Sequence, residues 1–225
     1  MSDEPRTCID RIPKLPTETP TERMSLIKEK LWGASMTLNV RFLGGAGDVQ
    51  GRVKAHAKEW KKHANINFAW VDAEPSHVRI AFIEGAGSWS YVGTDAKRIS
   101  DSKPTMNLGW LTPETDDDEY SRVVLHEFGH ALGCIHEHQH PAGGIVWNKP
   151  EVYKYYKEHD GWSKEDVDEQ IFARYDADLL VLTKAADPQS IMMYPIPSGF
   201  ANITVGWNRL LSQTDKTFIR SVYPL

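Results

Sequence analysis

The feature that most constrains this chain is a short run of residues with three histidines and one glutamate at fixed spacing. The run covers residues 126–136 and reads HEFGHALGCIH. On a helix, residues four apart lie on the same face, one turn above each other. His126 and His130 can therefore present two imidazoles to one ion. Glu127 lies beside the first of them, where it can reach a water on the metal without binding the metal itself.

A glycine after this helix explains how a third histidine can join the first two. Gly133 lies where the helix must end, and glycine tolerates the left-handed backbone that turns the chain sharply. Such a turn lets His136 swing back as a third ligand. Three histidines and one open position make a catalytic type of zinc site. The alternative is a helix with ordinary surface histidines, which would require the extended motif to arise by chance.

Hydrophobic periodicity predicts a regular first part of the chain and a less regular second part. Strands are expected at residues 38–43, 66–71, 78–83 and 105–109, the last of them at a sheet edge. Helices are expected at residues 21–32, 47–63, 119–132, from 150, at 164–175 and at 212–222. Residues 85–101, rich in Gly and Ser, are typical of a long surface loop. This order of elements predicts an α+β fold with a mixed sheet and helices packed on it.

A second motif lies well downstream of the histidines, at residues 190–194, and reads SIMMY. Together with the histidine run it resembles the metzincin clan of metallopeptidases, in which a methionine turn lies beneath the zinc. Met192 matches the clan's methionine, which is a packing residue and not a ligand. Tyr194, with Glu137 directly after the third histidine, makes the resemblance closest to the astacin family, whose turn reads Ser-x-Met-His-Tyr. Met193 stands where that family usually has histidine.

The resemblance implies a cofactor, an activity and residue roles. The implied cofactor is Zn2+, with His126, His130 and His136 as metal ligands and Glu127 as the general base. In the astacin family the tyrosine is an extra zinc ligand that swings away and stabilises the tetrahedral intermediate, so Tyr194 is expected both to bind the metal and to act in catalysis. The implied activity is that of a zinc-dependent endopeptidase that hydrolyses peptide or protein substrates.

The resemblance also implies a metzincin-like zincin architecture. An N-terminal arm at residues 1–30 is expected before a catalytic domain at 31–225. A twisted mixed sheet and two helices form the upper lobe at 31–133, and an irregular lower lobe covers 134–225. The substrate is expected in extended form along the cleft between the lobes, paired with a rim strand that matches residues 106–108. A monomer is expected.

Two cysteines, a carboxylate and two histidines leave alternatives open. Cys8 and Cys134 could form one bridge, although two free thiols are the simpler interpretation. A Cys8 thiolate could occupy the open zinc position and hold the peptidase latent, or Cys8 could be an ordinary cysteine in a tail. The family counterpart of Glu137 is salt-bridged to a new N-terminus, whereas a core-bonded or solvated carboxylate is expected equally. His138 and His140 are expected as surface-loop histidines.

Composition and charge bear on partners and on location. The formal net charge is -5 at pH 7, whereas nucleic acids and anionic membranes call for a basic face, so neither is expected as a partner. No apolar run follows the polar N-terminal residues, so no signal peptide is expected. The chain is therefore expected to be cytoplasmic as synthesised, or secreted by a non-standard route.

Three rival functions are less well supported than that of an endopeptidase. A zinc-bound relative that no longer cleaves is disfavoured by the intact Glu127 and Tyr194. A zinc hydrolase acting on non-peptide amides is disfavoured by the expected rim strand around Met106. A serralysin-like secreted protease is disfavoured because no Gly/Asp-rich calcium repeats follow the domain.

Overall fold

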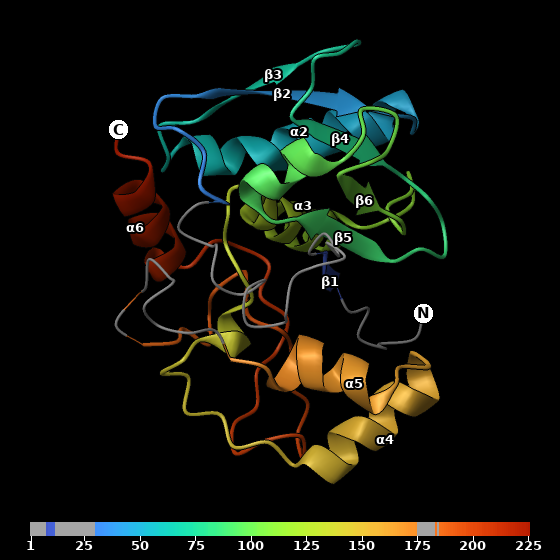
Figure 1. Ribbon diagram of the computed structural model, residues 1–225, viewed down its shortest axis with the longest axis vertical. Coiled ribbons are helices and arrows are strands. Elements are labelled where there is room, and N and C mark those ends of the chain that lie inside the picture. Colours follow the sequence, from blue (N-terminus) through green and yellow to red (C-terminus); the bar gives the residue numbers. More distant parts are fainter. Residues whose placement is uncertain (1–7, 12–29, 175–182, 184) are drawn as a thin grey trace.

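Two lobes make up the chain in a computed structural model that describes residues 8–11, 30–174, 183 and 185–225. The upper lobe in Figure 1 holds a mixed sheet and two long helices, α2 (Gly47–Lys61) and α3 (Asp117–Ala131). The lower lobe holds α4 (Lys149–His159) and α5 (Lys164–Val167). The last helix, α6 (Gln213–Val222), returns to the side of the upper lobe.

The sheet has six strands in the order β1-β5-β6-β4-β2-β3. They are β1 (Cys8–Arg11), β2 (Thr37–Phe42), β3 (Asn67–Trp70), β4 (Val78–Ala81), β5 (Ser88–Tyr91) and β6 (Met106–Leu108). Strands β3, β2, β4 and β6 run parallel, and β5 is antiparallel to β6. The N-terminal strand β1 pairs in parallel with β5. The predicted α+β fold with a mixed sheet is confirmed.

The two long helices of the upper lobe share one core with the sheet. Helix α2 buries a stripe at helical spacing, which the sequence predicted, consisting of Val49, Val53, Ala57 and Trp60. Helix α3 is buried from Tyr120 to Ala131. An amphipathic helix buries one stripe, whereas a helix packed on several sides is buried all round. Helix α3 is of the second kind, so residues on it are held in place from several directions.

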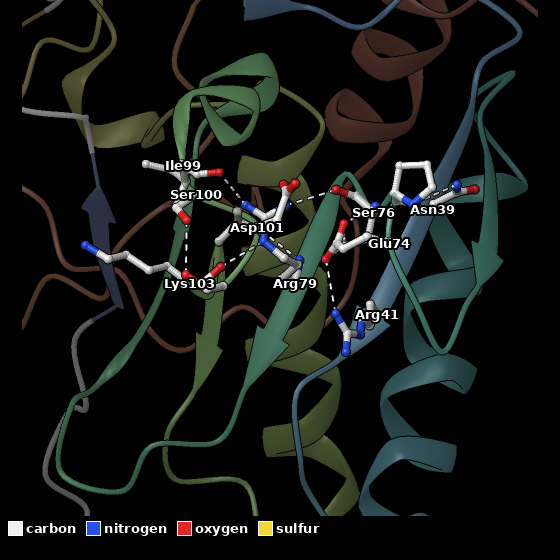
Figure 2. Close-up of polar contacts among 12 residues, drawn as sticks. Asn39, Arg41, Glu74, Ser76, Arg79, Ile99, Ser100, Asp101 and Lys103 are labelled. Atoms are coloured by element: carbon white, nitrogen blue, oxygen red, sulfur yellow. Dashed lines mark hydrogen bonds and ion pairs between the residues drawn. The ribbon is translucent and has the colours of Figure 1, made fainter.

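A buried arginine fixes the loops at one end of the sheet (Figure 2). Arg79 of β4 is 1% exposed. Its guanidinium donates hydrogen bonds to the backbone carbonyls of Ser76, Ile99 and Lys103, and Asp101 lies 3.7 Å away. Burying a charge is costly unless its donors are paired, and here they are. The loop that leads into β6 is thereby held against β4.

Two predictions about the stretch between β4 and α3 are wrong. Residues 85–101 are not one surface loop, because they contain the buried strand β5 and a short 3-10 helix, η2 (Gly93–Arg98). Strand β6 is not at an edge, because it lies between β5 and β4. The reason lies in Asn107 of β6, whose side chain bonds the backbone of Ile83 and Gly87. These bonds hold the turn that folds β5 back onto β6.

The lower lobe has a smaller core of its own, which includes Val152 of α4 and Val167 of α5. The helix predicted at 164–175 is shorter, because α5 passes into a π-helical turn, η4 (Asp168–Phe172), before the chain leaves the helix. The predicted helix at 21–32 falls mostly outside the described residues. Among the residues that the structure describes, no helix is long and apolar enough to cross a membrane.

Candidate metal centre

Helix α3 carries two of the three histidines, and it has a capped N-terminus and a tight turn at its C-terminus. At its start the carboxylate of Asp116 accepts the N–H of Glu119 at 2.9 Å, which caps the helix. At its end Gly133 has a φ of 97°, a backbone conformation that glycine adopts at little cost. The predicted sharp turn at this glycine is confirmed. It brings His136 back toward His130, which lies in the last turn of α3.

The three predicted histidines converge on one point. Nε2 of His126 lies 3.1 Å from Nε2 of His130, and Nε2 of His136 lies 3.2 Å from both. All three side chains are buried, and together they form a group that could hold a metal ion. Tetrahedral zinc with bonds of about 2.0–2.1 Å places its nitrogen ligands about 3.3–3.4 Å apart. The observed triangle therefore fits zinc with only a small outward shift of the rings.

Backbone carbonyls fix the tautomer of two of these rings. Nδ1 of His126 lies 2.8 Å from the carbonyl oxygen of Ile191, and Nδ1 of His130 lies 2.9 Å from that of Cys134. A carbonyl oxygen can only accept, so each Nδ1 is the donor and each Nε2 keeps its lone pair. Lone pairs gathered this closely repel one another unless a cation lies between them. The donor set is thus the one that a metal requires.

Glu127 and Tyr194, the other two predicted site residues, adjoin the histidines. Glu127 follows His126 in α3 and is completely buried. The ring of Tyr194 lies with its centroid 4.1 Å from that of His136 and 6.2 Å from that of His126. The fold therefore gathers residues from α3 and from the distant segment around residue 194 at one place.

His138 and His140 are buried, so the prediction of surface-loop histidines is wrong. They are 2% and 5% exposed. The ring of His138 stacks on Tyr194 at a centroid distance of 4.5 Å, and its Nε2 lies 2.9 Å from the carbonyl oxygen of Gln170. The rings of His136 and His138 also stack on each other at 5.2 Å, so Tyr194 packs against both of them in one cluster. In the sequence, the one signal for the contact between His138 and Tyr194 is that His138 lies two residues after the ligand His136.

Met192 lies directly beneath the histidine helix. A Cβ atom on Gly129 would overlap the sulfur of Met192 and come within 3.2 Å of Trp60. Gly129 directly precedes His130, so the methionine packs against α3 between the two helical histidines. Met192 therefore packs beneath the histidines, as the resemblance implied. This packing requires glycine at position 129, because a larger side chain there would overlap Met192.

A cavity of about 60 Å³ lies next to the third histidine. Its lining includes Cys134, His136, Glu137, Met192 and Asp215. Burial raises the pKa of Glu137 to about 7. Its Oε1 accepts the N–H of Asp187 at 2.8 Å, so this carboxylate is bonded within the core. Cys134 is a buried free thiol, so it forms no bridge with Cys8.

Comparison with a protein-family model gives a match over most of the chain. The model described as Astacin, a peptidase family, matches residues 27–223. Among solved structures, myroilysin superposes with a TM-score of 0.86 at 44% sequence identity, over 88% of this chain and 98% of that chain.

Two further relatives are more distant. High choriolytic enzyme 1, a hatching enzyme zinc-protease from Oryzias latipes (medaka fish), superposes with a TM-score of 0.60 at 18% identity, over 87% of this chain and 95% of that one. At this identity the likeness concerns the fold alone. Tolloid-like protein 1 of Mus musculus is 27% identical over 115 residues, which are 50% of this chain. The chain matches only 10% of the length of that relative.

Proposed function

This chain belongs to the astacin family of peptidases, and we propose that it hydrolyses peptide bonds at a zinc ion held by His126, His130 and His136. The family consists of zinc-dependent endopeptidases. The observation that carries the proposal is the convergence of three buried Nε2 atoms within 3.2 Å of one another. Two of them have the tautomer that a metal ligand needs.

A zinc ion held by His126, His130 and His136 would supply Lewis acidity to the scissile carbonyl and would lower the pKa of a bound water toward neutrality. Glu127 then takes the proton of the attacking water and passes it to the leaving amine. Its complete burial keeps bulk water from competing for that proton. We propose two roles for the hydroxyl of Tyr194. It donates a hydrogen bond to the oxyanion, and it serves as an additional metal ligand, since a phenol is both a donor and a weak ligand.

The substrate is proposed to be an extended peptide that binds between the lobes as an added strand on β5. The sequence placed this pairing on residues 106–108, but β6 lies between β5 and β4, two strands of the catalytic domain, so β5 is proposed in its place. The same edge of β5 is paired with β1 over Ser88–Tyr91. Substrate and the N-terminal arm therefore compete for the same backbone groups. We propose residues 31–225 as the catalytic domain and a monomer as the active form, since every residue invoked comes from one chain.

Substitution of the general base tests the proposed chemistry. In Glu127→Gln, kcat for cleavage of casein should fall by at least about 100-fold, because general acid–base catalysis contributes that much or more. Zinc content should stay at one ion per chain, since Glu127 is not a ligand. Glu158→Gln, an exposed glutamate of α4, is the matched control and should keep wild-type activity. Full activity of Glu127→Gln, or loss of its zinc, would reject the assigned role.

A pair of proline substitutions tests the place of the substrate. Proline has no N–H and interrupts a strand ladder. The double variant Ile9→Pro/Asp10→Pro should therefore free β5 and lower KM for a peptide substrate, with little change in kcat. The control Ile9→Ala/Asp10→Ala keeps the backbone donors and should resemble the wild type. An unchanged KM in the proline variant would place the substrate elsewhere.

A further inference from the structure

The N-terminal cap of α6 does more than begin a helix. Ser212 and Asp215 form a capping box, in which each side chain bonds the backbone of the other. The carboxylate of Asp215 also accepts the hydroxyl of Ser190 at 2.7 Å through Oδ1 and the N–H of Ile191 at 2.8 Å through Oδ2. Asp215 is 7% exposed. The cap of α6 is thus bonded to the segment beneath the histidines.

From Ser190 the hydrogen bonds continue to a metal ligand. The hydroxyl oxygen of Ser190 accepts the N–H of Met192 at 3.0 Å. That N–H belongs to the peptide group whose carbonyl, on Ile191, accepts Nδ1–H of His126 at 2.8 Å. Each member therefore donates toward the next, from the imidazole through one peptide group and one hydroxyl to the carboxylate. We call this series the Asp215 relay; its members are His126, Ile191, Met192, Ser190 and Asp215.

Burial makes this series more than a set of separate contacts. The five residues of the relay are all at most 7% exposed. Hydrogen bonds in series polarise one another, and the effect is greater where the surroundings have a low dielectric. The groups that face the Asp215 carboxylate in these bonds are a hydroxyl and two backbone N–H groups, all of which donate. That pattern is the one expected around an ionised acceptor.

We propose that Asp215 is a positioning residue of the metal site, which acts on His126 through Ser190 and the peptide group between Ile191 and Met192. The relay fixes the orientation of the His126 ring, and its terminal charge makes Nε2 a stronger electron donor. Direct carboxylate–histidine contacts around a metal have these two effects. The inference rests on the proposed role of His126 as a ligand. It assigns to α6, which carries no ligand, a part in setting metal affinity.

Metal affinity separates this role from simple helix capping. Asp215→Asn keeps the size of the side chain and removes its charge, and Ser190→Ala removes the hydroxyl link while leaving Asp215 in place. Each variant should bind Zn2+ about 10-fold to 100-fold more weakly than the wild type in competition with a chelator. Each should also shift the visible absorption bands of the Co2+-loaded protein, which report the ligand field. Because both changes break one relay, the double variant should bind Zn2+ no more weakly than the single variant with the lower Zn2+ affinity.

Two controls match the substitutions without breaking the relay. Helix α5 begins with the same capping box, formed by Ser163 and Asp166 at an exposed position. Asp166→Asn therefore makes the same chemical change elsewhere. Ser212→Ala weakens the cap of α6 itself while the Asp215 carboxylate and its bonds to the turn remain. Both controls should keep wild-type Zn2+ affinity and Co2+ spectra, although each should lower Tm by about 2–4 °C.

The outcomes separate the relay from the proposed function. Wild-type affinity and spectra in both Asp215→Asn and Ser190→Ala would overturn the relay and leave the zinc site standing. Equal weakening in Ser212→Ala would show that only the cap matters, which also overturns the relay. Failure of the wild-type protein itself to bind zinc would reject the proposed function, and the relay with it. Near-ultraviolet circular dichroism of each metal-free variant identifies any loss of folding, and Ser190→Ala decides the outcome if Asp215→Asn does not fold.

Discussion

The two lobes hold their parts of the site by different means. In the upper lobe, His126 and His130 stand on one buried helix, and the helix geometry alone sets their spacing. In the lower lobe, His136 and Tyr194 stand on irregular chain, where no repeating backbone pattern fixes them. Their place depends on the turn at Gly133, on ring stacking with His138 and on the packing of Met192. A helix supplies its ligands together, whereas each residue of the irregular lobe has to be fixed separately.

The largest effect is expected where the lower lobe supplies a ligand. His136→Ala should lower kcat/KM by more than about 100-fold, which is the upper end of the effect of residues that only support a ligand. Bound zinc should fall below one ion per chain after dialysis, as measured by atomic absorption. Retention of one tightly bound zinc ion would mean that α3 holds the metal without the lower lobe.

The second effect concerns a lower-lobe residue that is proposed to act mainly in the transition state. Tyr194→Phe keeps the ring packed against His136 and His138 and removes only the hydroxyl. Loss of one donor to an oxyanion costs about 100-fold to 1000-fold in kcat. KM should change little, and zinc should stay bound. A kcat within threefold of the wild type, measured under saturating substrate, would remove Tyr194 from the mechanism.

A third effect tests the contact that joins the lobes. Gly129→Ala places a methyl group on the sulfur of Met192, and overpacking of this kind costs about 1–3 kcal/mol of the free energy of unfolding. Urea denaturation of the metal-free protein measures it. Met192→Ala removes the overlapping atom but leaves a cavity of its own, so the double variant should lose less stability than the sum of the two single variants. If the glycine substitution costs nothing, the packing between the lobes is looser than described.

The smallest effect should fall on a regular part of the lower lobe that lies outside the site. Ser163→Ala removes the side-chain cap of α5 and should cost about 1 kcal/mol of the free energy of unfolding. Zinc affinity and kcat should match the wild type. A change in either would show that α5 is coupled to the metal site, which would weaken the contrast between the lobes.

The same contrast explains what the sequence could and could not predict. Local periodicity and capping patterns predicted the strands around residues 38 and 78, helix α3 and the helix that begins after Ser212. The turn at Gly133 followed from one residue with an unusual backbone requirement. Strand β5 was missed because its local composition is that of a loop, and it forms through pairing with the distant strands β6 and β1.

Contacts between distant segments were the other part that sequence reasoning missed. The burial of His138 depends on Tyr194 and on Gln170, which lie far away along the chain. The bonds of Asp215 to Ser190 and Ile191 were missed for the same reason. A capping box is a local pattern, whereas these bonds join distant segments of the chain. Local signals predict where a helix begins, but not what else its cap touches.

X-ray absorption spectroscopy of the zinc-loaded full-length protein tests the central claim most directly. The account predicts one zinc ion per chain with three imidazole nitrogens at about 2.0–2.1 Å in its first coordination shell. A shell with fewer than three imidazoles, or a protein that fails to retain stoichiometric zinc after purification, would contradict it.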